Sequence, residues 1–128
     1  MEQKVSSAAR SGTPQGMKDA MKKATTEMLV LFMLRQKTMY SYEMMQEIAR
    51  LTDGVLTFNT LYLAVYRLQD HGYIVEQEKR IVDGRARAYL AITETGRTYL
   101  AQLREQYALM TGAINALLAQ DGKLYGNE

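Results

Sequence analysis

The stretch 94–119 constrains this chain most, because it predicts one long helix with an apolar seam. The rest of the predicted domain, residues 17–92, is too small to cover that seam along its whole length. The seam recurs at alternating spacings of four and three residues over three heptads. It consists of Gly96, Leu100, Leu103, Tyr107, Met110, Ile114 and Leu117. Flanking positions are mostly small or apolar, which indicates a face wide enough for more than one neighbour. We expect this helix to mediate self-association; packing wholly on its own domain is the alternative.

Three shorter helices and a hairpin are predicted before the long helix. Apolar periodicity predicts helices over about 17–36 and 42–51, the second with Ser41 as N-cap. A third begins after Thr57 and stops at Gly72, where His71 is expected to bond free helix carbonyls. Two extended runs, 73–80 and 86–92, flank an Asp-Gly turn signal, and Thr93 caps the last helix.

This element order predicts a mainly α fold with a small β-hairpin, namely a winged helix-turn-helix plus a long C-terminal dimerisation helix. The expected divisions are a flexible N-terminal arm (1–16), the winged helix-turn-helix domain (17–92), the C-terminal helix (93–119) and a polar tail (120–128). The arm is mildly basic, so it is either a solvated tail or a segment that touches phosphates.

Composition removes most catalytic chemistry. The chain has no cysteine and one histidine, His71, so thiolate metal sites and cysteine nucleophiles are excluded. We expect no enzyme activity, no cofactor and no metal site. The longest apolar run, Met28–Leu34, is far shorter than the about 20 residues that cross a bilayer. The first residues carry no apolar stretch typical of a secretory signal, so a cytoplasmic protein without membrane contact is expected.

Polar and basic side chains gather where a winged helix-turn-helix contacts double-stranded DNA. In this architecture the third helix enters the major groove and the hairpin touches the backbone. Hydroxyl and amide groups at the start of that helix can bond base edges or phosphates, and the hairpin is basic. The candidate DNA-binding residues are Tyr42, Thr57, Asn59, Thr60, Tyr62, Tyr66, Arg67, Lys79, Arg80, Arg85 and Arg87. A solvated basic loop is the alternative interpretation of the hairpin.

Three blocks of the sequence resemble the PadR-like transcriptional regulators. They are Tyr40-Ser41-Tyr42-Glu43; Thr60-Leu61-Tyr62 with Arg67-Leu68 and Gly72-Tyr73-Ile74; and Gly84-Arg85-Ala86-Arg87-Ala88-Tyr89 with Ile92-Thr93 and Gly96. The resemblance covers about residues 28–103. It implies a repressor-type homodimer that binds an inverted repeat, with release by a small molecule in some members. The few residues after Leu118 resemble the short subgroup with a single C-terminal dimerisation helix. Many relatives have proline, glycine, proline and lysine in place of Phe58, Asn59, Leu63 and Ala88.

The dimer interface is expected to combine N-terminal methionines with the C-terminal seam. Seven of the nine methionines lie between residues 17 and 45, where they can fill an irregular core or form an adaptable surface, and core filling is preferred. The expected dimerisation residues are Met17, Met21, Met28, Leu100, Leu103, Tyr107, Met110, Ile114 and Leu117. A small apolar or aromatic effector is a further candidate partner. Two functions compete with DNA binding: a winged-helix module that binds only protein, and an apolar-ligand-binding dimer.

Overall fold

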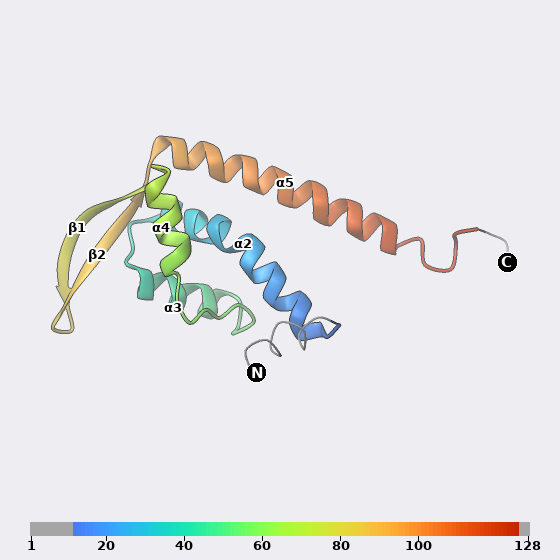
Figure 1. The fold of residues 1–128 in the computed structure, drawn as a ribbon, viewed down its shortest axis with the longest axis horizontal. Helices are drawn as coiled ribbons and strands as arrows, with labels where there is room; N and C mark the ends of the chain where they lie inside the picture. The colour runs from blue at the N-terminus through green and yellow to red at the C-terminus, as the bar shows by residue number, and fades with distance from the viewer. Residues whose placement is uncertain (1–11, 126–128) are drawn as a thin grey trace, which may run out of the picture.

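The computed structural model describes residues 12–125, and α5 extends well beyond the other elements (Figure 1). The elements follow the predicted order of helix, helix, helix, hairpin, helix. They are α2 (Pro14–Gln36), α3 (Ser41–Leu51), α4 (Tyr62–Asp70), β1 (Ile74–Val82), β2 (Arg85–Ile92) and α5 (Glu94–Leu118). In Figure 1 helix α2 lies between α5 above and α3 below.

Helix α2 begins earlier than its apolar stripe indicated. Thr13 caps it by accepting a hydrogen bond from the Gly16 N–H at 3.1 Å, and Pro14 occupies the first turn, where its missing N–H costs nothing. The expected start at residue 17 and the end of the arm at residue 16 were therefore wrong, because the cap lies before the stripe. The rest of the expected arm, residues 1–11, lies outside the described residues.

Helix α4 is shorter than predicted and begins at Tyr62 rather than after Thr57. The Thr60 hydroxyl accepts a hydrogen bond from the Tyr62 N–H at 3.0 Å, and buried Leu61 is the N-cap residue. At the other end, His71 Nδ1 lies 2.8 Å from the Arg67 carbonyl oxygen, so His71 bonds a helix carbonyl as expected, but this carbonyl also accepts the His71 backbone N–H at 3.0 Å and is not otherwise free.

The hairpin is longer than predicted, because both strands continue to a two-residue turn. Asp83 and Gly84 both have positive φ, 52° and 77°, which matches the twist of the flanking strands. The strands pair antiparallel, with an irregularity between Glu76 and Glu78. The turn carries the hairpin tip away from the helices (Figure 1).

The core forms around the C-terminal half of α2. Val30 and Leu31 are fully buried, and residues of every other element pack around them. These are chiefly Met44, Ile48, Leu61, Leu68, Ile74, Leu90 and Leu100. The methionines divide into two groups: Met33, Met39 and Met44 fill the core as expected, whereas Met17 and Met21 are exposed.

Candidate nucleic-acid interface

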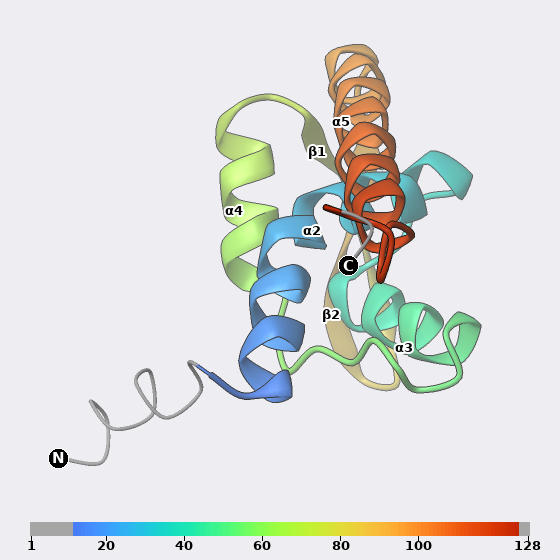
Figure 2. The same ribbon diagram turned by 90° about the vertical axis from the view of Figure 1, so that its right-hand side faces the viewer.

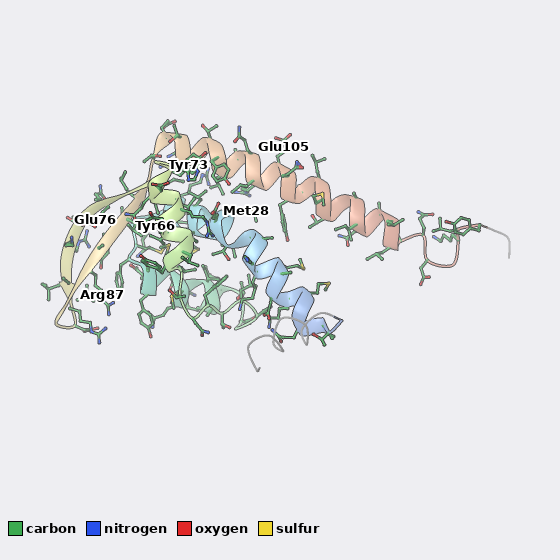
Figure 3. The ribbon with its side chains drawn as sticks, in the orientation of Figure 1. Met28, Tyr66, Tyr73, Glu76, Arg87 and Glu105 are labelled. Carbon is green, nitrogen blue, oxygen red and sulfur yellow. The ribbon has the colours of Figure 1, made fainter. Side chains whose placement is uncertain are left out.

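The exposed face of α4 carries two tyrosines and a leucine. Tyr62, Leu63 and Tyr66 are 68%, 62% and 57% exposed, while Ala64 and Leu68 on the opposite side are buried in the core. The Tyr62 and Tyr66 rings stack with centroids 6.4 Å apart, and Figure 3 shows Tyr66 on the outer side of the helix. This face therefore offers two phenol hydroxyls and an apolar surface.

The polar residues expected in the first turn of this helix lie in the loop before it. Thr57, Asn59 and Thr60 are exposed, but none has helical conformation, so their placement in a helical turn was wrong. The cause is burial: Phe58 and Leu61 pack against the core, and this holds the segment in an irregular path. These exposed hydroxyl and amide groups still lie immediately before the exposed tyrosines, although the Thr60 hydroxyl already accepts a hydrogen bond from the Tyr62 N–H.

Arg67 does not extend freely from α4. Its Nε donates to Glu27 Oε2 of α2 at 2.9 Å, and Tyr99 of α5 donates its hydroxyl to Oε1 of the same carboxylate at 3.3 Å. Burial and the Glu27 charge raise the pKa of Tyr99, which keeps its phenol protonated as the donor. Arg67 therefore links α4 to α2 through Glu27, and its expected role as a DNA contact stays a prediction.

The basic residues of the hairpin differ in whether another side chain already pairs with them. Lys79 pairs with Glu76 at 3.1 Å, and Arg80 pairs with Glu78. Arg87 is half-buried, with its guanidinium 5.1 Å from the Tyr40 ring centroid, and Figure 3 shows its position on β2. Arg85, beside the turn, is exposed and has no acidic partner among the described residues. Arg85 is thus the cation of the hairpin most available to a phosphate.

An aromatic cluster at the base of the hairpin was missed from the sequence. Tyr40 and Tyr89 meet edge-to-face at 5.3 Å, and the Arg80 guanidinium lies 4.2 Å from the Tyr89 centroid. Alternation along β2 places Arg87 and Tyr89 on one face, which is the signal that could have revealed the cluster. These contacts hold the hairpin arginines in position. Tyr42, two residues after Tyr40 and in the first turn of α3, is exposed as a candidate contact requires.

A second exposed surface is apolar and separate from the α4 face. We call it the α2/α5 apolar face, and it comprises Met17, Met21, Tyr107, Met110, Ile114 and Leu117. Between the two helices lie hollows of about 420 and 410 Å³ lined by members of this face together with Met28. Leu100 is 2% exposed and Leu103 packs on the core, so counting Leu100 among dimer contacts was wrong. The N-terminal part of the seam, around Leu100 and Leu103, therefore packs within the protomer.

Neither a metal site nor a membrane span occurs in residues 12–125. No three histidine, aspartate or glutamate side chains in this range are grouped to hold a metal ion. None of the helices there has the combination of length and hydropathy that crossing a bilayer requires.

Helices α3 and α4 with the following hairpin define a winged helix-turn-helix protein. Residues 30–102, more than half of the chain, match the family model "Transcriptional regulator PadR-like family". The chain belongs to the PadR-like family of transcriptional regulators, and its activity class is therefore DNA-binding transcription regulation. The expected family and fold are confirmed.

Similar proteins agree with this assignment. A transcriptional regulator from Clostridium thermocellum is 28% identical, with a TM-score of 0.69 over 76% of this chain and 96% of that one. A PadR family regulator from Eggerthella lenta is 26% identical, with a TM-score of 0.68 over 81% of this chain and 90% of its own. An uncharacterized protein from Lysinibacillus sphaericus is 32% identical over 82 residues, which is 62% of this chain and 75% of that protein.

Proposed function

We propose that this protein is a repressor that binds an inverted-repeat operator as a homodimer and is released by a small apolar or aromatic effector. The observation that carries the proposal is the exposed tyrosine face of α4 together with unpaired Arg85 on the hairpin. A helix face with hydroxyls suits the major groove, and a basic hairpin suits the flanking backbone. A dimer bound at an operator excludes other proteins from that DNA. Chromosomal DNA as partner also supports a cytoplasmic site of action.

The α2/α5 apolar face supports the homodimer. Its six side chains are all at least 46% exposed, and they form two neighbouring stripes on separate helices. A contiguous apolar surface of this kind is typical of an interaction site rather than of a free surface. A two-fold dimer presents two identical α4 helices, and this symmetry matches the two half-sites of an inverted repeat.

The hollows between α2 and α5 support the effector. One of about 410 Å³ is lined by Met21, Met28, Leu103, Tyr107 and Met110 among others. Thioether and aromatic side chains suit an apolar or aromatic molecule, since methionine adapts its shape to what it contacts. Binding there would change the packing of α2 on α5.

The experiment that tests DNA binding is a titration of the full chain against DNA from upstream of its own gene and against random DNA, at increasing salt. A regulator with six to ten phosphate contacts loses roughly 10³–10⁵ in affinity between 50 and 200 mM salt. It should also prefer the upstream DNA at every salt concentration. Equal and salt-insensitive affinity for both DNAs would contradict the proposal, and favour a module that binds only protein or an apolar ligand.

A further inference from the structure

The arginines without an acidic partner fall into two separate groups. Within residues 12–125, Arg50, Arg67 and Arg80 pair with glutamates, and the other arginines have no carboxylate within 4.0 Å. Two of the unpaired arginines belong to the hairpin, where the proposed DNA contact accounts for them. The remaining three are Arg35, Arg97 and Arg104. They lie on α2 and α5, and the proposed function leaves them unexplained.

These three arginines line one hollow. Arg35 lies in the last turn of α2, and Arg97 and Arg104 lie seven residues apart on α5, so they project from the same side of that helix. The hollow has a volume of about 310 Å³, and Leu100 and Ala101 complete its lining. The methyl group of Ala101 between the two α5 arginines leaves room for a ligand.

All charged residues that line the hollow are positive. Three of its lining residues are arginines, and none is acidic. The Arg104 guanidinium carbon lies 5.5 Å from the Phe32 ring centroid, which restrains the orientation of this side chain. The three arginines carry like charges, which repel one another, and an anion bound among them removes that repulsion. A restrained arginine also loses less side-chain entropy when it binds.

We propose that this hollow binds a small molecule that carries a phosphate group. A guanidinium presents a planar fork of donors that matches phosphate oxygens, and three forks can neutralise a group with two or more negative charges. Ala101, which is exposed, provides apolar contact for the rest of the molecule. All residues that line the hollow belong to α2 or α5, so the hollow is distinct from the α4 face and the hairpin.

The test uses pyrophosphate and inorganic phosphate as probes of the full-length protein, with chloride added to hold ionic strength constant. Pyrophosphate should bind in calorimetry and raise the thermal midpoint, since it contacts both α2 and α5 and stabilises their packing. Arg35→Gln with Arg97→Gln should weaken binding by at least about tenfold, the loss expected for charge-assisted hydrogen bonds. The matched control is Arg85→Gln, which removes an unpaired arginine from the hairpin and should bind pyrophosphate like the natural chain.

Several results would overturn the proposal. One is the absence of pyrophosphate binding; another is equal affinity in the double variant; a third is an equal loss in Arg85→Gln, which indicates a diffuse charge effect. If the double variant instead weakens dimerisation and leaves pyrophosphate binding unchanged, a carboxylate of a second copy occupies the hollow. If it lowers DNA affinity and the salt slope, the hollow contacts DNA. Should the double variant unfold, Arg97→Gln alone allows the same comparison. None of these outcomes depends on the protein being a repressor.

Discussion

Gly96 has the least space for a side chain, because the first turn of α5 packs directly on the start of the hairpin. A Cβ atom at this position would lie 2.1 Å from the Tyr73 carbonyl oxygen. The same oxygen accepts a hydrogen bond from the Thr93 N–H at 3.0 Å, so it cannot move away without losing a bond that anchors Thr93, the N-cap residue of α5. Glycine here is therefore a requirement of backbone packing.

We predict that Gly96→Ala lowers the free energy of unfolding by about 3 kcal/mol, at the upper end of overpacking costs. Urea unfolding of both proteins measures the difference. Gly112→Ala is the matched control, because it lies in the same helix with no atom within 4 Å of its Cβ position. There alanine should be neutral or raise stability by about 1 kcal/mol through helix propensity. Equal effects at the two positions would contradict the packing argument.

Glu27 pairs with Arg67 beside the proposed DNA face. Glu27→Gln weakens this contact, removes one negative charge and leaves the Arg67 guanidinium without a carboxylate partner beside α4. We predict that random DNA binds severalfold more tightly, and that the ratio of operator to random affinity falls, because phosphate attraction carries no sequence information. Fluorescence anisotropy with both DNAs measures this. The control is Glu105→Gln, which makes the same charge change on α5, away from α4 (Figure 3). It should alter neither the ratio of operator to random affinity nor the fold. A matching drop in the ratio there would count against the role of Glu27.

Local contacts were predictable from the sequence, and distant contacts were not. The Thr93 side chain accepts a hydrogen bond from Gly96 three residues later, so residue type and spacing suffice to predict that cap. Arg67 and Glu27 are 40 residues apart, and no spacing rule relates them. The ion pair of Arg67 with Glu27 could be identified only once α2 and α4 were seen side by side (Figure 2).

The arginines of the hairpin differ in the side chains that they contact. We predict that Arg85→Ala lowers the salt slope of DNA binding by about one, as expected for one lost phosphate contact. Arg80→Ala should lower it by much less, because Glu78 and the Tyr89 ring already engage that guanidinium. Slopes from titrations at several salt concentrations measure this, and an equal loss in both variants would show that the internal pairs open on DNA.

The third helix shows how packing overrides a capping signal. Thr57 followed by an apolar periodicity predicts a helix start, yet α4 begins only at Tyr62. Phe58 and Leu61 are anchored in the core on the way, and a helix starting at Thr57 would change the direction of both. The long α5, by contrast, has its cap and periodicity in agreement, and its predicted bounds are close to the observed Glu94–Leu118.

The whole molecule is organised around α2, whose two halves have different neighbours. The C-terminal half of α2 packs in the core with the other elements, while the N-terminal half and the distal half of α5 remain exposed. The heptads of α5 predicted one continuous seam, but Leu100 belongs to the protomer core and Ile114 does not. Sequence periodicity cannot distinguish an internal neighbour from a second copy, since both require the same apolar stripe.

This division makes the proposed dimer testable without unfolding the protomer. Ile114 is 50% exposed and outside the core, so Ile114→Asp should leave a folded monomer, whereas Leu103→Asp should destabilise the protomer itself because Leu103 packs on the core. Light scattering gives the mass and circular dichroism reports the fold of each variant. The Ile114→Asp monomer should bind a single half-site weakly and lose most operator affinity, because the second half-site no longer binds as part of the same complex. An intact Ile114→Asp dimer at micromolar concentration would move the interface away from the distal half of α5.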